Sequence, residues 1–409
     1  MYPIASRTRA RPWQRWFAVV AAINAGIAVS YVGLWLISMA QGLFWRADFT
    51  AYYTAWTMVR AGAAAQVYDF AVQAVYQQRV LGGRSFSEGL LPYVNPPHVT
   101  LFFAPLAWLT LPHAFYLWTA GQGVLLVVLI RTTLALTADW LSRERLAALC
   151  AMLAFPPLLF TLLRGSFSLL VLVAVLGLYR YQIARRPGRA GLWLAMASMK
   201  PQLVLLPALA MLVGRRWRVL RTAGLAGIAC VLAATLAFGP QSWLGFLQAV
   251  RTIDRYYGIF GIVPATMYNL KGTLTLWLGN EQGVLIGMVS AIAFALGVCA
   301  TLWLWRRPWA PGSNQFALRF AQTVLLGLVL GPHLHSHDGL VLVAPVLIVA
   351  QYLYTDPARR HLAAGFTLVP LITLLGEFGL AGALGIRLPT LLMILLGLWL
   401  AREIRRCPD

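Results

Sequence analysis

Uncharged apolar runs of roughly 14 to 25 residues recur along the whole chain, and short segments between them hold its charged residues. A helix needs about 20 apolar residues to cross a bilayer, so the longer runs predict transmembrane helices. The shorter runs predict partial or broken crossings, which are tolerated where they line a polar cavity. The pattern therefore predicts an all-α, polytopic membrane protein with about 11 to 13 transmembrane helices.

Composition supports this class of protein. The 409-residue chain is 60% hydrophobic and 11% charged, and its mean hydropathy is +0.72. The net charge of +21 comes from basic residues in short clusters between apolar runs. The positive-inside rule describes this distribution, so the charge gives no indication of a nucleic-acid partner. The four cysteines have neither metal-ligand nor disulfide spacing.

The basic clusters also predict sidedness in a cell membrane, inner or plasma. Residues 1–15 hold four arginines and no acid, so the N-terminus is expected in the cytoplasm and the first loop, 42–97, outside. Alternation after Arg215 places the C-terminus in the cytoplasm too. The expected later spans are 222–238, 283–305, 317–332, 339–354, 362–382 and 388–401, with outer loops at 239–282, 333–338 and 383–387. No linker interrupts the chain, so residues 1–409 are expected to form one transmembrane domain.

Residues 190–214 do not fit a simple crossing, because basic clusters flank both ends. Pro201 interrupts the run in the sequence MKPQ, and a helix does not pass a proline undisturbed. We therefore expect two short helices, with Lys200 and Gln202 at an outward-facing tip.

Residues 97–164 hold three apolar runs where the sidedness requires an even number of crossings. One run is therefore expected to be a partial or broken helix. Pro112 and the Pro156–Pro157 pair are the expected breaks.

The first outer loop carries an acid just after the first apolar run. Asp48 lies where the membrane meets water, and only 12 residues of the chain are acidic. Such a residue indicates a functional group, while the alternative is a cap on the following helix. Aromatic residues, including Tyr52 and Tyr53, come next. The patterns over 50–60 and 66–79 predict amphipathic helices lying on the membrane surface.

Polar residues from six separate stretches are expected on the same outer side, which favours a common site. They are Asp48, Tyr93, Asn95, Arg164, Lys200, Gln202, Asn269, Lys271, His333, His335, His337 and Asp338. Lys200, beside a helix start, suits an anionic phosphate, although a lysine there can also snorkel to lipid headgroups. Sugar or phosphate contacts suit the HLHSHD run better than zinc. Glu377 and Arg319 lie inside spans, where helix pairing or a cavity-facing role is the default.

Four segments over roughly 45–345 resemble a known family. They are DFTAYYTAW with VYD at 67–69, YVNPPHVTLFFAPLAWLTLP at 93–112, the block from RGSFSLL to GRRWR at 164–218, and GPHLHSHDGLVLVAPVL at 331–347. Together and in this order they resemble glycosyltransferase family 87, the multi-spanning polyprenyl-phosphate-mannose-dependent mannosyltransferases of the GT-C fold. The chain departs from the family pattern at Ser166, where many relatives have glutamine.

This resemblance implies that Asp48 is the general base and that Lys200 and the 333–338 loop lie near the donor phosphate. We expect Arg164 and Gln202 to contact the donor with them. The expected acceptor or loop contacts are Tyr52, Tyr53, Tyr93, Asn95, Asn269 and Lys271.

The expected function is transfer of a hexose, with mannose as the expected sugar, from a polyprenyl-phosphate donor to a lipid or glycan acceptor on the extracytoplasmic face. No metal ligands are assigned, and a divalent cation is left open. The alternative is a non-catalytic flippase or exporter of lipid-linked sugars. A carrier would place coupling acids near the middle of spans, and only Glu377 fits that pattern.

Overall fold

The computed structural model describes residues 12–43, 48–86, 89–253, 263, 266–377 and 385–407. Within these residues the chain forms α-helices and short 3-10 helices, and no strand. The predicted all-α class is therefore confirmed. Most of the N-terminal arginine cluster and parts of the expected loops 239–282 and 383–387, as well as of the span 362–382, lie outside the described residues.

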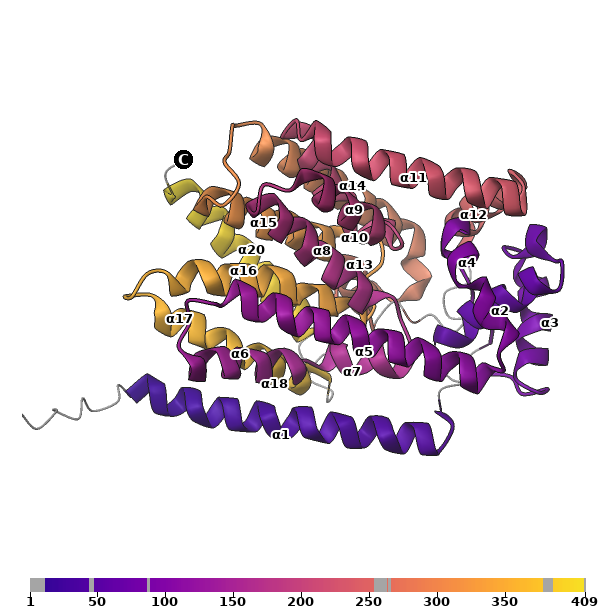
Figure 1. Cartoon of the computed structure of the whole chain (residues 1–409), viewed down its shortest axis with the longest axis horizontal. Helices are drawn as coiled ribbons and strands as arrows, with labels where there is room; N and C mark the ends of the chain where they lie inside the picture. The colour runs from indigo at the N-terminus through magenta and orange to yellow at the C-terminus, as the bar shows by residue number, and fades with distance from the viewer. Residues whose placement is uncertain are drawn as a thin grey trace, which may run out of the picture.

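Four helices are long and apolar enough to cross a membrane by themselves. They are α1 (Pro12–Ala40), α5 (Leu111–Leu136), α11 (Trp217–Phe238), and α14 (Gly283–Trp305) with the preceding η6 (Asn280–Gln282). Figure 1 shows them running roughly parallel, with α1 and α11 along opposite edges. Five shorter apolar helical segments join them. The polytopic class is supported, and the total of 11 to 13 spans stays a prediction.

The Pro156–Pro157 pair breaks a helix as the sequence predicts. α6 (Ser142–Leu153) and α7 (Pro156–Arg164) are bent by 47° across this break. Counted as one broken span, the pair would bring the long apolar spans to five. The bend determines where Arg164, the last residue of α7, is placed.

Other prolines also mark where helices begin. The two short helices expected around Lys200 are α9 (Pro187–Ala197) and α10 (Pro201–Val213). The partial helix within 97–164 is α4 (Pro97–Phe103), which continues into the 3-10 helix η3 (Ala104–Trp108). Pro112 lies in the first turn of α5, where proline costs no hydrogen bond, so it begins a helix rather than breaking one.

α8 (Ser168–Ile183) and α15 (Asn314–Leu330) form the centre of the bundle, because most of their residues are buried. Tyr179 of α8 stacks on Phe316 of α15 with ring centroids 5.4 Å apart. Around them lie α9, α10, α16 (Val343–Tyr354) and α20 (Leu388–Arg406). Helices that are apolar on all faces bury well in such a centre.

The C-terminal part contacts the N-terminal helix. It contains the short helices α17 (Arg360–Gly365), η8 (Phe366–Leu368) and α18 (Val369–Leu375) before α20. α1 packs against α6, α7 and η8. The Asn24 Nδ2 of α1 donates a hydrogen bond of 2.9 Å to the Thr367 carbonyl of η8.

Several short helices gather beyond one end of the long helices, on the right of Figure 1. They are α2 (Asp48–Arg60), η2 (Ala64–Gln66), α3 (Phe70–Val80), α4 and α12 (Gln241–Thr252). Phe49 and Trp56 of α2 are fully buried, and both rings pack near Trp118 of α5. This aromatic cluster anchors α2, and Asp48 with it, to the bundle.

Both helices predicted in the first outer loop form, and their position relative to the membrane surface stays a prediction. α2 buries most of its residues in the protein. The polar stripe of α3 faces inward: Gln73 and Gln77 exchange hydrogen bonds with the backbone of Tyr93 and Leu91, while Val75 is 47% exposed. The backbone groups of a buried extended segment need such partners, and the periodicity of the helix does not reveal them.

Candidate active site

Polar side chains from five separate segments meet at the end of the bundle that holds α2. The segments are the start of α2, the end of α7, the start of α8, the residue before α10, and the loop that leads into η7 (Asp338–Leu342). Each segment contributes its polar side chain from a helix end, so the positions of these side chains are determined by where the helices begin and end. Such a site is rigid without a long ordered loop.

Asp48 lies between a cation and a histidine. Its Oδ1 is 3.5 Å from Arg164 Nη1, and its Oδ2 is 3.5 Å from His337 Nδ1. Burial raises the pKa of Asp48, but His337, and after it Arg164, lower it by more, so the net shift is downward. The carboxylate is therefore ionised at neutral pH. Both contacts are longer than a normal hydrogen bond, and the side chain is 22% exposed, so its oxygens remain accessible.

Gly165 allows α7 to end beside the start of α2. It follows Arg164 in the left-handed conformation, with φ of 67°, which favours glycine. A Cβ at this position would lie 2.9 Å from the Phe49 Cβ and 3.1 Å from a ring carbon of Phe115. The close approach brings Arg164 to the Asp48 carboxylate.

Asp338 forms a second, tighter cluster. Its Oδ1 is 2.5 Å from Lys200 Nζ and accepts a hydrogen bond of 2.6 Å from the Ser168 hydroxyl. The Ser166 hydroxyl lies 2.8 Å from that of Ser168, and Lys200 also donates to Ser168 at 3.3 Å. Asp338 and Lys200 are both buried. This is a buried, hydrogen-bonded ion pair, in which the Asp338 carboxylate neutralises the charge of Lys200.

His337 lies between the two carboxylates. Its Nδ1 is 3.5 Å from Asp48 and its Nε2 is 3.6 Å from Asp338. Burial lowers its pKa to about 4, although both carboxylates act to raise it, so the ring is neutral at pH 7. The backbone carbonyl of His337 accepts a hydrogen bond of 3.1 Å from Thr161. Because His337 is neutral, the charged groups of the site are two carboxylates, Asp48 and Asp338, and two cations, Arg164 and Lys200.

The other two loop histidines continue the row. The His335 ring stacks on His337 at 5.8 Å, and His333 stacks on His335 at 6.5 Å. Burial and the neighbouring His337 lower the pKa of His335 to about 3. Among the described residues, no three His, Cys, Asp or Glu side chains converge as ligands for one metal ion.

Tyr52 is the aromatic residue of α2 that reaches the site. Burial, followed by the charges of Asp48 and Asp338, raises its pKa well above the usual value, so its hydroxyl stays protonated near both carboxylates. Its ring packs against Tyr93 and Phe167. Tyr53 points elsewhere, because its hydroxyl donates to the Leu109 carbonyl at 2.6 Å.

Four other predicted residues support the surrounding structure. The Tyr93 hydroxyl pairs with Thr100 at 2.7 Å, and the Asn95 carbonyl accepts a hydrogen bond from Tyr68. Asn269 caps α13 (Leu270–Leu278), and its Nδ2 donates to the Gly331 carbonyl at 2.7 Å, which holds the histidine loop. Lys271 is buried in the first turn of α13. Gln202 lies half-buried in the first turn of α10, and the described contacts do not join its side chain to the cluster.

Two residues that the sequence did not indicate also belong to this region. Ser168 bonds both members of the Asp338–Lys200 pair. Gln122 of α5 donates from Nε2 to the Ser166 carbonyl at 3.0 Å, and its buried Oε1 has no hydrogen-bond partner in the described part of the chain. In the sequence, Ser168 could have been noticed as a serine shortly after a helix-ending glycine. Gln122 could have been noticed as a lone amide in an apolar span.

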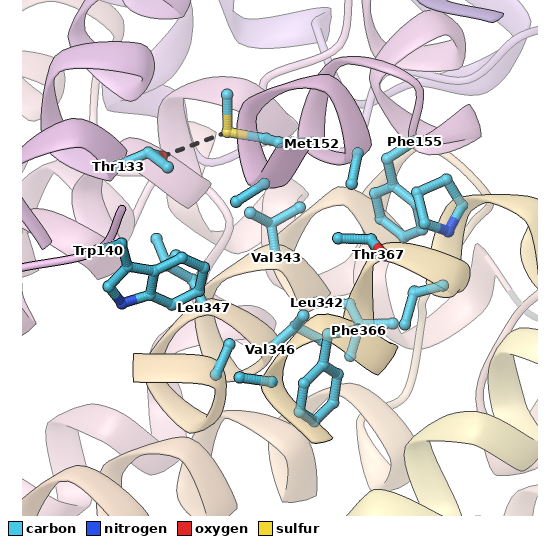
Figure 2. A pocket seen from close by; sticks show the side chains of 16 residues that line it. Thr133, Trp140, Met152, Phe155, Leu342, Val343, Val346, Leu347, Phe366 and Thr367 are labelled. Carbon is cyan, nitrogen blue, oxygen red and sulfur yellow. Dashed lines mark hydrogen bonds between the residues drawn. The ribbon is translucent and has the colours of Figure 1, made fainter. Parts of the chain in front are cut away.

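Two apolar cavities flank the bundle interior. One, of about 340 Å³, lies beside Ser166 and Gln122 and is lined mainly by aromatic and aliphatic side chains such as Phe103 and Trp118. The other, shown in Figure 2, measures about 70 Å³ and lies among α5, α6, α16 and α18. Its described lining holds no acidic or basic side chain; its labelled polar contact joins Thr133 to the Met152 sulfur. Only the larger cavity adjoins the polar cluster.

Comparisons with known proteins agree with this architecture. The profile of glycosyltransferase family 87 matches residues 93–332. A protein of Mycolicibacterium smegmatis, polyprenol-phosphate-mannose-dependent alpha-(1-2)-phosphatidylinositol mannoside mannosyltransferase, is 31% identical over 302 residues, which are 68% of this chain and 64% of that protein. The chain thus matches somewhat less than two thirds of the length of this relative. No solved structure gave a significant match.

The family match covers more than half of the chain. It includes Arg164, Ser168 and Lys200, but begins after Asp48 and ends just before His333. The resemblance seen in the four sequence segments is confirmed by this independent comparison. The chain belongs to glycosyltransferase family 87.

Proposed function

We propose that this protein transfers a hexose, mannose in the first instance, from a polyprenyl-phosphate donor to a lipid or glycan acceptor, with Asp48 as general base. The observation that carries the proposal is the state of Asp48. It is an ionised, partly exposed carboxylate 3.5 Å from the Arg164 guanidinium. The relative's name supports the donor, because that protein depends on polyprenol-phosphate-mannose and acts on a phosphatidylinositol mannoside.

The proposed reaction is one displacement with inversion at the sugar. An acceptor hydroxyl oxygen attacks the anomeric carbon, and its proton passes to Asp48. The bond between the anomeric carbon and the phosphate oxygen breaks, and its electron pair leaves with the polyprenyl phosphate. Arg164, whose side chain is 49% exposed, is the cation best placed to stabilise the charge that develops there. Lys200, which is paired with Asp338 in the interior, contributes further positive charge.

The lipid part of the donor needs an apolar path to this site. The cavity beside Ser166 is lined by Phe102 and Leu117, which are 52% and 54% exposed on the outer surface of the bundle. An isoprenoid chain entering from the bilayer would therefore meet the polar cluster at Ser166. We propose this cavity as the position of the first isoprene units.

Sidedness is proposed from charge. α20 ends in Arg405 and Arg406, and this end of α20 lies on the side opposite α2 in Figure 1. The start of α11, with Arg218 and Arg221, lies at that same far end. Basic clusters face the cytoplasm, so the site at α2 would be extracytoplasmic and both termini cytoplasmic in a cell membrane.

The test is sugar transfer from radiolabelled polyprenyl-phosphate-mannose by the purified protein, with an extracted membrane lipid fraction as acceptor. Asp48→Asn removes the base and should reduce transfer by about 10²- to 10⁴-fold. Asp69→Asn is the matched control in the same loop, because Asp69 caps α3 and asparagine caps equally well. Transfer by Asp48→Asn at the wild-type rate would contradict the proposal. A chelator added to the wild-type assay tests the divalent cation.

A carrier of lipid-linked sugars would share the cavity and the cations. Its discriminating feature would be a proton-coupling acid within a span. Glu377, the one acid that fits, accepts a hydrogen bond from Tyr268, and Tyr268 itself donates from its backbone to Leu334 in the histidine loop. This arrangement supports a structural role for Glu377. Binding of the donor by wild type without any product would favour the carrier.

A further inference from the structure

A basic pocket lies at the end of the bundle opposite Asp48. It is formed by the end of α14, the start of α15 and the end of α20, and its volume is about 410 Å³. Its cationic lining residues are Arg306, Arg307, Arg319 and Arg405, and no acidic side chain belongs to its described lining. It is distinct in place and in chemistry from the site at Asp48.

The base of the pocket is pre-organised. Arg319 is only 4% exposed; its Nε donates to Gln315 Oε1 at 2.9 Å, and its Nη1 to the Arg307 carbonyl at 3.3 Å. Gln315 Nε2 in turn donates to the Ile404 carbonyl at 2.9 Å. The three helix ends are therefore held together by side-chain hydrogen bonds. Arg306, Arg307 and Arg405 are exposed around the opening.

The nearest acid of α20 is already engaged elsewhere. Glu403 is 2.7 Å from Arg359 Nη1 and accepts a hydrogen bond of 2.8 Å from the Tyr352 hydroxyl. It is not part of the pocket lining. The three exposed guanidinium groups of Arg306, Arg307 and Arg405 make the opening of the pocket positive, and guanidinium groups match the geometry of a phosphate.

One side of the pocket is formed by the end of an apolar segment that is long enough to cross a membrane. Trp303 lines it at the end of the apolar segment Asn280–Trp305, and its side chain is 51% exposed. The Arg306 guanidinium lies 5.2 Å from the centre of that ring. An exposed tryptophan next to arginines at a span end is typical of the membrane–water interface. A ligand in this pocket would meet lipid tails on one side and arginines on the other.

We propose that this pocket binds the phosphate of an anionic phospholipid headgroup in the cytoplasmic leaflet. The shared chemistry is that of a phosphate oxyanion, and its place beside exposed apolar surface favours a lipid over a soluble anion. Basic pockets between membrane helices on the cytoplasmic side bind such headgroups. The proposal is independent of glycosyl transfer and of the role of Asp48.

The test is a titration of the full-length protein, purified in a neutral detergent, with phosphatidylglycerol, the bound lipid being counted by native mass spectrometry. The variant Arg307→Gln/Arg405→Gln removes two cations at the opening and leaves Arg319 with its hydrogen bonds in place. The control Arg218→Gln/Arg221→Gln removes two exposed arginines from α11, at the same end of the bundle but outside the pocket. Both variants change the net charge equally.

We expect the pocket variant to raise the lipid dissociation constant about 30-fold and the control to raise it by less than about twofold. The reason is that each cation contributes about 1 kcal/mol to lipid binding at such a surface. Equal weakening in the two variants would overturn the proposal. So would displacement of half of the lipid by inorganic phosphate at a concentration equal to that of the lipid, because apolar contacts would then add nothing and a soluble anion would bind equally well.

Discussion

Asp48 and Asp338 lie on either side of His337, and their surroundings differ. Asp338 has a 4% exposed side chain, with Lys200 at 2.5 Å and the Ser168 hydroxyl at 2.6 Å. Asp48 has a 22% exposed side chain, and its nearest described cation is 3.5 Å away. A buried carboxylate that a lysine and a hydroxyl hold through one oxygen is a poor proton acceptor, while an accessible one can receive a proton from a bound hydroxyl. The comparison supports Asp48 as the base and Asp338 as a fixed charge that positions Lys200.

The largest expected difference between the two aspartates is in how much each contributes to the stability of the fold. Asp338→Asn leaves the Lys200 ammonium buried without its carboxylate, and breaking one side of a buried pair costs about 3–5 kcal/mol. We expect the midpoint of thermal unfolding in detergent to fall accordingly. Asp48→Asn, at a partly exposed position, should leave that midpoint nearly unchanged.

A double variant separates the lost pair from the lost carboxylate. Asp338→Asn/Lys200→Met removes both charges, so it should recover most of the stability that Asp338→Asn loses. Transfer should stay low in the double variant, because Lys200 is absent. If Asp338→Asn alone unfolds at the wild-type temperature, the pair is not in a dry interior, and the contrast with Asp48 fails.

The histidine between the two carboxylates predicts a pH dependence of stability. The pKa of His337 is about 4 in the folded protein and about 6.5 when unfolded. Between these values the unfolded chain binds a proton that the folded chain does not, so stability falls as the pH falls from 6.5 towards 4. The loss attributable to this buried ring is about 3 kcal/mol.

His337→Gln should remove that part of the acid sensitivity. The measurement is the unfolding midpoint at pH 7 and at pH 4.5 for each protein. His361→Gln, which replaces an exposed histidine on α17, is the control and should keep the wild-type difference between the two pH values. An identical pH profile in wild type and His337→Gln would show that the ring is not buried in its neutral form.

The sequence predicts those parts of the fold that depend on local rules. Prolines end and begin helices through their own backbone chemistry, so the break at Pro156–Pro157 and the two helices around Lys200 could be expected without a structure. The charge pattern also predicts sidedness, and which side of the membrane holds the site stays a prediction. The pattern places Asp48, Arg164 and the histidine loop on one side, and the structure brings them together.

Pairings between distant segments are what the sequence does not reveal. Asp338 and Lys200 are 138 residues apart, and nothing in either motif says that they neutralise each other. Lys200 alone looked like a phosphate ligand, whereas the structure gives it a carboxylate partner. The inward-facing glutamines of α3 are similar, because their partners lie on the extended segment around Tyr93. Such contacts depend on tertiary packing, which periodicity does not encode.

The smallest predicted effect concerns the backbone that holds Asp48 near Arg164. Gly165→Ala puts a Cβ 2.9 Å from Phe49, the residue after Asp48, and places an alanine at φ of 67°. The backbone strain alone should cost about 1–2 kcal/mol of unfolding free energy. Gly62→Ala is the matched control, because Gly62 has φ of 81° and a Cβ there would meet no described neighbour within 4 Å. Both variants should lose stability through backbone strain, and Gly165→Ala should lose more because of its contact with Phe49. Only Gly165→Ala should lose transfer, by about tenfold, because it alone moves the end of α7 away from the carboxylate. Equal transfer by the two variants would mean that the position of Arg164 relative to Asp48 does not matter, and Asp48 would then differ from Asp338 only in its exposure.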